Sequence, residues 1–461
     1  MAEASRSRRC PGAALFARFV MLIALSFAAL VQPAAAQSIL RDAETETLFR
    51  DMSRPLVEAS GLRPENVSIV LIHDRTINAF VAGGQVVYIH SGLLAAADNA
   101  NEVQGVIAHE LGHITGGHII RFGESMRAVM GITLLSLLLG AAAMAAGAGE
   151  AGAGILAAGQ QAALGKYLAY SRAQESSTDQ AGASFLAKAG ISGRGSLSFH
   201  KKMLNQEFRL AVSQDNGYAR THPLHSERIA MLEDLYQKDP AWDKAPDRAL
   251  EERFQRVKAK LAGYVEDPKQ TLVKYPESDK SVPARYARAY AWHKSAYPDK
   301  AAAEVDSLLS EKPQDPYFLE LKGQILLESG KPGEALQSLR QAVERAPDQP
   351  LISALFGHAL ISTENEKNFE EAKKVLRSAI GRDNNNPFAW YQLGIVYDRE
   401  GDHARASLAT AERYNLEGRA RLALANAEQA MMGIPTGSPD WIRAQDIAMV
   451  SRSEVERQKK R

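Results

Sequence analysis

The fold of the first half of this chain is decided by residues 99–121, which read NANEVQGVIAHELGHITGGHIIR. Apolar residues recur there at the spacing of one helical face, namely Val103, Val106, Ile107, Leu111 and Ile114. His109 and His113 are four residues apart, so both imidazoles project from one side of a helix predicted over 99–121. Two imidazoles at this spacing reach one zinc ion at about 2.0–2.1 Å. Glu110 is placed to act as a general base beside that metal, and Gly112 leaves backbone space there.

A catalytic zinc ion requires a third protein ligand. A histidine ten residues after His109 would fall on Ile119, whereas His118 is one residue short and about 100° away around a continuous helix. Further along the chain, Glu175 and Asp179 are four residues apart and share one helical face. We predict that Glu175 is the third ligand and that Asp179 accepts the N–H of a ligand histidine, which would fix the tautomer of that ring.

The residues before this helix are typical of a mixed α and β segment over 37–125. Residues 67–72 and 86–89 are rich in β-branched side chains and are bounded by turn formers, as strands are. Residues 82–85, Ala-Gly-Gly-Gln, predict a turn between 78–81 and the second strand. If 86–89 is an exposed edge strand, it would align an extended polypeptide by main-chain pairing.

The N-terminal segment has the order of a secretory signal peptide: basic residues up to Arg18, an apolar run over 19–31, and small residues over 34–36. We expect cleavage after Ala36 and a periplasmic mature protein, with an uncleaved anchor as the alternative. The only cysteine, Cys10, lies in this segment, so the metal ligands of the mature chain must be His, Asp or Glu. Lys and Arg number 55 against 54 Asp and Glu, a balance that does not favour nucleic acid as a partner.

Residues 128–165 are almost free of charge, with Glu150 as the one interruption. The leucine-rich first half is long enough to span a bilayer, whereas the second half is mainly Ala and Gly, which insert weakly. We predict a hydrophobic helical hairpin, lying over the active site or against a membrane surface, and place a true membrane span second.

A repeat with a period near 34 residues follows a connector over 239–282, in which one helix is predicted at 248–261. Glycine, alanine and proline recur at this period over 283–416, and the middle unit carries a three-residue insertion at 366–368. The pattern resembles tetratricopeptide repeats, which are stacked helix-turn-helix units. The domain organisation is therefore predicted as a signal peptide (1–36), a metalloprotease domain (37–238), the connector, and repeats over 283–461, with Trp441 in a capping tail.

The motifs together resemble the HtpX and CAAX-prenyl-protease family of zinc peptidases, and within it the periplasmic BepA-type branch. The matching stretches are 78–80, 92–94, 108–113 with His118, Arg172-x-x-Glu175-x-x-x-Asp179, and 221–223 followed by Arg228. The resemblance implies one zinc per chain on His109, His113 and Glu175, with Glu110 as general base. It also implies that His222 lies near the zinc, where it either occupies the open coordination position or donates to an oxyanion, and that Arg228 pairs with a carboxylate or substrate. Thr178 stands where the family commonly has alanine, and we expect no catalytic cost.

The expected fold is mainly α, with a small β-sheet in a zincin-type domain, followed by a tetratricopeptide superhelix. The expected function is zinc-dependent cleavage of unfolded polypeptides. The resemblance adds assistance to outer-membrane β-barrel assembly, removal of stalled precursors, and contact with the assembly machinery through the repeats. Two alternatives remain: a chaperone or adaptor with secondary proteolysis, and a membrane-integrated protease.

Overall fold

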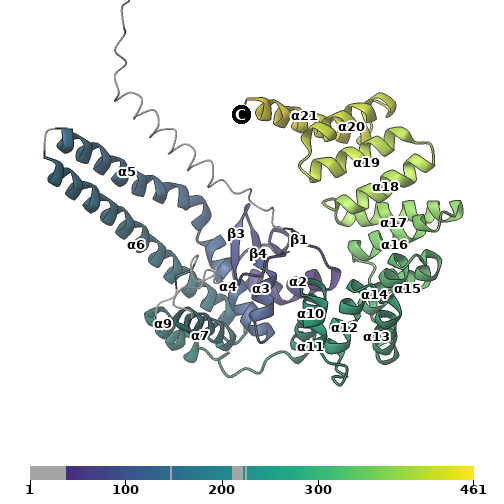
Figure 1. Cartoon of the computed structure of the whole chain (residues 1–461), viewed down its shortest axis with the longest axis horizontal. Helices are drawn as coiled ribbons and strands as arrows, with labels where there is room; N and C mark the ends of the chain where they lie inside the picture. Colours follow the sequence, from purple (N-terminus) through teal and green to yellow (C-terminus); the bar gives the residue numbers. More distant parts are fainter. Residues whose placement is uncertain (1–37, 146–147, 210–221, 224–225, 461) are drawn as a thin grey trace, which may run out of the picture. The chain divides into compact units, whose positions relative to one another are not determined.

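The computed structural model describes residues 38–145, 148–209, 222–223 and 226–460 (Figure 1). The predicted signal peptide lies outside these residues. Residues 39–461 form one compact unit. The predicted fold class is confirmed: a small sheet with helices over 39–237, then pairs of helices to the end of the chain.

The sheet has four strands in the order β1-β2-β4-β3: β1 (Ile39–Leu40), β2 (Ser68–Ile72), β4 (Val86–His90) and β3 (Ala79–Ala82). β4 runs parallel to β2 and antiparallel to β3. The turn between β3 and β4 needs Gly83 and Gly84, whose φ values of 61° and 101° strain any other L-residue. The condition that 86–89 be an exposed edge strand is not met, because β4 is hydrogen-bonded on both sides. The two edge strands of this sheet are β1 and β3.

Helices α2 (Ala43–Ala59), α3 (Ser91–Ala96) and α4 (Ala100–Thr115) accompany this sheet, with a 3-10 turn, η1 (Pro64–Asn66), after α2. Asn99 begins α4 by accepting a hydrogen bond from the Glu102 N–H. The apolar face read from the sequence is buried in a core shared with α2 and the sheet: Val103, Val106, Ile107 and Leu111 pack with Phe49, Met52, Val87 and Ile89.

The single helix predicted over 99–121 is wrong at its C-terminal end. α4 stops at Thr115, and a new helix, α5 (His118–Ala145), begins after Gly116 and Gly117. Gly117 has a φ of 63°, so it breaks the helix at low cost. The side chain of His118 therefore does not point where a continuous helix would send it.

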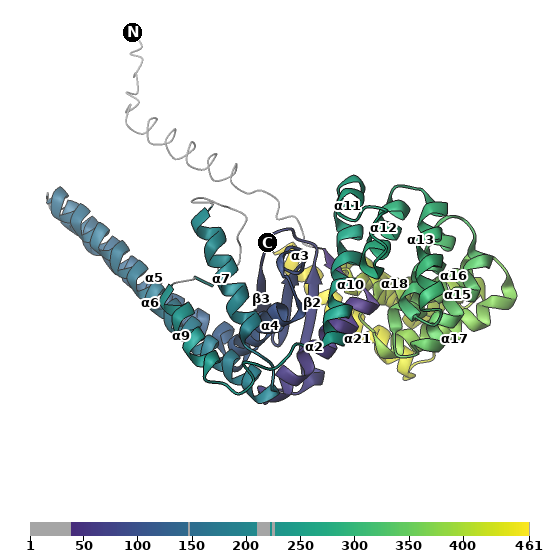
Figure 2. The ribbon, with the colours of Figure 1, turned by 90° about the horizontal axis from the view of Figure 1, so that it is seen from below.

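α5 and the 41-residue α6 (Gly149–Ala189) lie side by side as a long hairpin (Figures 1 and 2), as predicted for 128–165. α6 continues past the hairpin and packs against α4. Two more helices, α7 (Arg194–Arg209) and α9 (Ser226–Gln237), complete this part of the chain.

The connector holds two helices, α10 (Arg248–Val265) and α11 (Pro268–Lys274), where one was predicted. The repeats follow as consecutive pairs: α12 (Val282–Lys294) with α13 (Pro298–Glu311), α14 (Pro316–Glu328) with α15 (Pro332–Arg345), α16 (Pro350–Ser362) with α17 (Phe369–Arg382), α18 (Pro387–Arg399) with α19 (His403–Leu416), and α20 (Ala420–Gly433) with α21 (Pro439–Lys459). The three-residue insertion forms a 3-10 turn, η2 (Glu366–Asn368). Gly323 and Gly357 lie where helices of a pair meet, since an added Cβ would come within 2.4 Å of Leu339 and 2.6 Å of Leu376.

Buried charges join the first half to the repeats. Arg256 of α10 pairs with Glu44 at the start of α2 and with Asp315 at the start of α14. Tyr286 of α12, which is fully buried, donates to the same Glu44 at 2.9 Å. One glutamate therefore has partners from both the connector and the repeats.

Candidate metal centre

Two helices that cross closely bring the predicted ligands together. α4 carries His109, Glu110 and His113, and α6 carries Glu175 and Asp179. The crossing depends on glycine: a Cβ on Gly112 would lie 2.8 Å from the Thr178 carbonyl oxygen, and one on Gly182 would lie 3.1 Å from that of Ala108. The space at Gly112 is therefore filled by α6, and the expectation that it opens beside the metal is wrong.

Four side chains converge in this crossing: His109, His113, Glu175 and His222. His109 Nε2 lies 3.2 Å from His113 Nε2 and 3.3 Å from Glu175 Oε2, and His113 Nε2 lies 3.4 Å from Glu175 Oε1. Four ligands held tetrahedrally at 2.0–2.1 Å from zinc are about 3.3 Å from one another. The three predicted ligands have this spacing, so the residues fit a tetrahedral metal ion.

His222 takes the fourth position of the same set. Its Nδ1 is 3.1 Å from His109 Nε2 and 3.2 Å from Glu175 Oε2. Its other nitrogen, Nε2, is 3.4 Å from the carbonyl oxygen of Ala79 on β3 and 3.4 Å from Glu110 Oε1. The ring is 5% exposed, so His222 is itself shielded from solvent.

A second layer of polar contacts holds the ligands. Asp179 Oδ1 is 2.9 Å from His109 Nδ1, which leaves Nε2 of that ring facing the centre. Arg228 on α9 forms ion pairs with both carboxylates. Its Nε and Nη2 donate to Asp179, and its Nη1 lies 3.0 Å from Glu175 Oε2. The same Nη1 donates to the carbonyl of Pro223 at 3.0 Å. Arg228 therefore couples the loop that carries His222 to the ligand helix.

Neighbouring groups of opposite charge shift the pKa values of His109, Asp179 and Glu175 toward their charged forms. Burial alone lowers the pKa of His109, but its hydrogen bonds to Asp179 and Glu175 outweigh burial and raise that pKa to about 9. Burial would raise the pKa of Asp179, yet Arg228 and His109 hold it well below its usual range. For Glu175, His222 and the two ligand histidines likewise overcome burial and depress the pKa. Both carboxylates are therefore anionic at neutral pH, as metal binding requires.

Glu110 is fully buried beside these donors. Among the residues that the structure describes, neither of its carboxylate oxygens has a hydrogen-bond partner. His222 Nε2 lies 3.4 Å from Glu110 Oε1, so this carboxylate adjoins the group of donors.

His118 lies at the edge of the centre and does not belong to the set of four donors. The Gly116–Gly117 break brings its Nδ1 to 2.9 Å from His113 Nδ1 and 3.2 Å from Thr178 Oγ1. Burial and the nearby His113 lower the pKa of His118 to about 4. Thr178, fully buried, is thus a partner of His118, which the sequence alone did not indicate.

Two further features escaped sequence analysis. The Ala79 carbonyl of β3 faces His222, but main-chain groups leave no trace in a sequence motif. His200 of α7 is buried with its ring centre 6.1 Å from that of His109, and its Nδ1 lies 2.7 Å from the Ser196 carbonyl oxygen. A single histidine on a helix gives no spacing signal.

Comparison with known proteins agrees with this geometry. Residues 41–236 match peptidase family M48, and residues 317–349 match the tetratricopeptide repeat. The chain is 25% identical to the beta-barrel assembly-enhancing protease of Yersinia pestis over 81% of this chain and 76% of that protein. It is 30% identical to the metalloprotease LoiP of Escherichia coli K12 over 38% of this chain and 65% of that protein.

Among solved structures, that of the tetratricopeptide protein YrrB aligns with 38% of this chain and 91% of its own, at 19% identity and a TM-score of 0.31. The matched peptidase region contains α4, α6 and His222, and so it includes all four donors. The chain thus carries a metalloprotease domain of peptidase family M48, with a tetratricopeptide-repeat region behind it.

Proposed function

We propose that this protein is a zinc-dependent endopeptidase of the periplasm that cleaves unfolded polypeptides. The observation that carries the proposal is the set of donor distances among His109, His113 and Glu175, all between 3.2 and 3.4 Å. Three protein ligands of the His and Glu type, with a fourth position that can open, are typical of catalytic zinc. The predicted signal peptide supports the periplasmic assignment.

The described residues divide the work of hydrolysis. Zinc, when bound, polarises the scissile carbonyl and lowers the pKa of a water. Glu110, whose oxygens accept no hydrogen bond from the residues that the structure describes, takes the proton of that water and returns it to the leaving amine. Asp179 and Arg228 hold His109 and Glu175 in place. The pairing of His109 with Asp179 keeps the ring nitrogen that faces the centre available.

His222 serves as a gate in this scheme. In the described position its Nδ1 fills the fourth place among the donors, so the resting site is closed. When His222 leaves, that place opens to a substrate, and the displaced ring can donate a hydrogen bond to the oxyanion. Arg228 links the position of Pro223 to that of α6, because its Nη1 contacts both the Pro223 carbonyl oxygen and Glu175 Oε2.

The substrate is an extended chain. β3 is an edge strand, and its Ala79 carbonyl oxygen lies 3.4 Å from His222 Nε2. An extended peptide added to β3 would pass next to the donors and obtain its main-chain hydrogen bonds from the strand. An unfolded polypeptide offers such extended segments along its whole length. The names of the relatives extend this proposal to precursors of outer-membrane β-barrel proteins.

The test is Glu110→Gln. The variant should bind one zinc per chain and lose cleavage of an unfolded protein such as reduced casein by about 10²-fold or more, as expected for removal of a general base. Glu65→Gln, an exposed glutamate in η1, is the matched control and should cleave normally. Full activity of Glu110→Gln, or a wild-type chain that binds no stoichiometric zinc, would refute the proposal.

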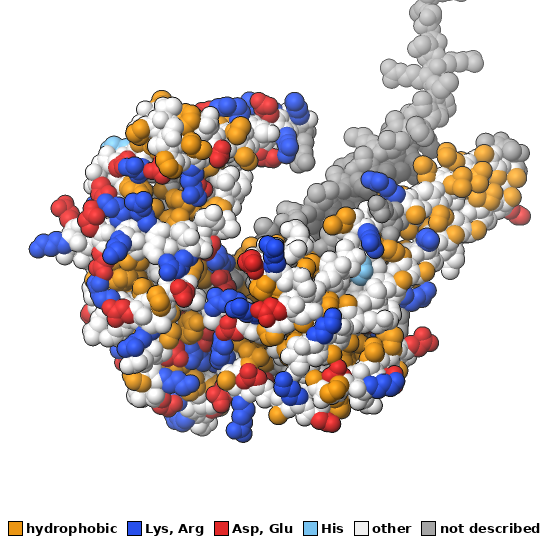
Figure 3. Space-filling view, turned by 180° about the vertical axis from the view of Figure 1, so that it is seen from behind, with side chains coloured by type: hydrophobic (Ala, Val, Ile, Leu, Met, Phe, Trp, Pro, Cys, Tyr) orange, Lys and Arg blue, Asp and Glu red, His pale blue; other side chains and the backbone are white. Residues whose placement is uncertain are grey.

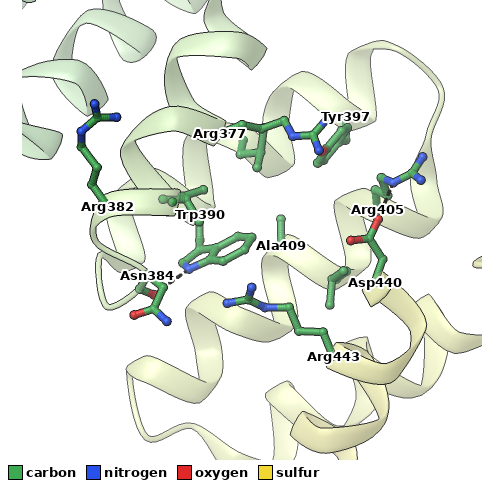
Figure 4. Close-up of a pocket in the computed structure, with 13 residues that line it drawn as sticks. Arg377, Arg382, Asn384, Trp390, Tyr397, Arg405, Ala409, Asp440 and Arg443 are labelled. Atoms are coloured by element: carbon green, nitrogen blue, oxygen red, sulfur yellow. Dashed lines mark hydrogen bonds and ion pairs between the residues drawn. The ribbon is translucent and has the colours of Figure 1, made fainter. Parts of the chain in front are cut away.

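A second candidate function, that of a chaperone or adaptor, is favoured by a pocket in the repeats. The pocket holds about 450 Å³ and lies among α17, α18, α19 and α21 (Figure 4). Four arginines line it with one acid and aromatic rings: Arg377, Arg382, Arg405 and Arg443, with Asp440, Trp390 and Tyr397. This composition fits an acidic peptide with an apolar side chain.

The arginines of the pocket differ in the ion pairs that they already form within the protein. Arg405 is already neutralised by Asp402 and Asp440, each 2.8 Å away. Arg443 pairs with Glu412 and lies 4.7 Å above the Trp390 ring, which orients it. Arg377 forms no ion pair with any residue in the described part of the chain. It is therefore the first arginine that a carboxylate would meet.

The two functions are separable by complementation. In a host that lacks this protein, rescue of outer-membrane β-barrel assembly by Glu110→Gln would favour the adaptor function, and failure would favour proteolysis. Adding Arg377→Glu and Arg382→Glu to the inactive variant should abolish an adaptor-type rescue. Arg421→Glu, on the exposed surface of α20, is the matched control and should leave the rescue unchanged.

A further inference from the structure

The α5–α6 hairpin exposes large apolar side chains and buries small ones, the opposite of a helix pair in water. Its large apolar side chains face outward, with exposures of 51% to 61%: Leu134, Leu135, Leu137, Leu138 and Leu139. Its buried positions are held by small residues: Ser136, Gly140, Gly152, Gly159 and Ala163. Helices in water bury large apolar residues and expose small or polar ones. Hydrophobic side chains accordingly gather on the outer part of the hairpin (Figure 3, upper right).

The small residues allow the two backbones to approach closely. A Cβ on Gly159 would lie 2.0 Å from the Ser136 Cβ, and one on Gly152 would lie 2.7 Å from the Gly140 carbonyl oxygen. Helix pairs in lipid associate in this way. A leucine side chain is as well solvated by lipid as by a neighbouring helix, so the pair is held by close packing of the two backbones instead. The contact surface of this hairpin is thus of the membrane type.

Length and flanking charges fit a bilayer. Met126–Met144 is long and apolar enough to cross a membrane, and 6% of it is buried inside the protein. Its 19 residues extend over about 28 Å, close to the thickness of the hydrocarbon layer. Arg127 on α5 and Lys166 on α6 are exposed at the base of the hairpin, where anionic headgroups would meet them.

The polar residues of the second arm lie at compatible depths. Tyr167, 39% exposed, adjoins Lys166 and suits the interfacial layer, where aromatic rings collect. Gln160 and Gln161 are within about 9 Å of Lys166 along α6, near the headgroups. Glu150 is at the opposite end of the hairpin, where it would reach the far interface.

We propose that the α5–α6 hairpin inserts into a phospholipid bilayer, with Arg127 and Lys166 at the near headgroup layer and the leucines in the hydrocarbon. The proposal does not depend on zinc or on proteolysis. It also defines where substrates are met. His118 precedes Arg127 by nine residues and Glu175 follows Lys166 by nine, so each arm reaches the metal centre after about 14 Å. Polypeptides at a membrane surface are then the accessible class of substrate.

Flotation with vesicles tests the insertion. The exported and processed chain, mixed with phosphatidylethanolamine and phosphatidylglycerol vesicles, should float with the lipid. Leu134→Asp with Leu138→Asp should reduce the floating fraction at least tenfold. The matched control is Val273→Asp with Met432→Asp, which alters side chains 82% and 75% exposed outside the hairpin and should float like the wild type. Equal flotation of all three, or of none, overturns the proposal.

A label measures depth and separates lipid from other occupants. The predicted mature chain has no cysteine, so Leu138→Cys and Val273→Cys each accept one environment-sensitive fluorophore. Vesicles should shift the emission of the label at 138 to the blue, with quenching by acyl-chain nitroxides, and should leave that at 273 unchanged. Insertion would be refuted if vesicles leave the emission of the label at 138 unchanged. A change on adding unfolded polypeptide instead would identify a substrate-binding surface, and a change with protein concentration alone would identify a self-association surface.

Discussion

Gly112→Ala sets two effects of known size against each other. Alanine is the better helix former by about 1 kcal/mol, so propensity alone predicts a more stable α4. At this position, however, the new Cβ would lie 2.8 Å from the Thr178 carbonyl oxygen and 2.9 Å from its Cγ2, whereas ordinary contact begins at 3.4 Å. The helices must therefore separate by roughly 0.6 Å, and overpacking of this kind costs about 1–3 kcal/mol. We expect a small net loss of stability.

The larger effect should appear at the metal centre. Thr178 is one helical turn after Glu175, so a displaced α6 carries Glu175 away from His109 and His113. A shift of this size exceeds the roughly 0.5 Å within which a functional site must be held. Zinc affinity should fall about 10–100-fold, as it does when the support of a ligand is disturbed. Cleavage of an unfolded protein should fall by a similar factor at limiting zinc.

Chelator competition measures the zinc affinity, and thermal unfolding of the metal-free chain measures stability. Gly165→Ala is the matched control, because it lies on the same helix as Glu175 and an added Cβ there meets nothing within 4 Å. It should be neutral or stabilising and should bind zinc normally. If Gly112→Ala folds, binds zinc and cleaves as well as Gly165→Ala, then the close crossing of α4 and α6 does not position the ligands.

Three further predictions concern the metal centre. Glu175→Ala should lose stoichiometric zinc by elemental analysis, whereas Glu227→Ala, on exposed α9 surface, should keep it; zinc retained by both would remove Glu175 from the ligand set. His222→Ala should still bind one zinc per chain, because three donors remain, and a chain devoid of zinc would show that the gate is an obligatory ligand. Asp179→Asn should lower the Tm of the metal-free protein. The raised pKa of His109 contributes stability that is fully present below about pH 6.5 and is lost as pH rises through 9. The depressed pKa of Asp179 contributes stability that is lost as pH falls below about 3.8. The Tm difference between the wild type and Asp179→Asn should therefore be largest between these limits and should narrow toward pH 9. A difference that grows toward pH 9 would contradict this linkage.

The parts of the fold that were predictable rest on local patterns. The apolar spacing of α4 and the period of the repeats persist over many residues, and each is expressed by side chains of the element itself. Even the insertion at 366–368 could be placed, since it offsets a regular period and appears as η2. The candidate ligands were found because a zinc site with two histidines needs a third donor, and the structure brings Glu175 and Asp179 to the predicted side of α4.

The errors lie where tertiary structure decides. Gly116 and Gly117 could have continued the helix, and only the position of α5 requires the positive φ at Gly117. Which strand is the sheet edge depends on pairing between distant residues, so a pattern of β-branched side chains could not distinguish β4 from β3. The contacts of Thr178 with Gly112 and His118 likewise arise because α6 packs against the end of α4 and the start of α5, far from it in sequence.

The shared glutamate at the start of α2 has a consequence for how this protein can be taken apart. Glu44 is 4% exposed and Arg256 is 8% exposed, and Asp315 and Tyr286 complete their surroundings from the repeats. Truncating the chain after the connector would remove Asp315 and Tyr286 and expose the remaining pair of Glu44 and Arg256 to solvent. A peptidase domain cut at this boundary would therefore keep charged groups on a surface that the repeats normally cover, and we expect it to be less stable than the full chain.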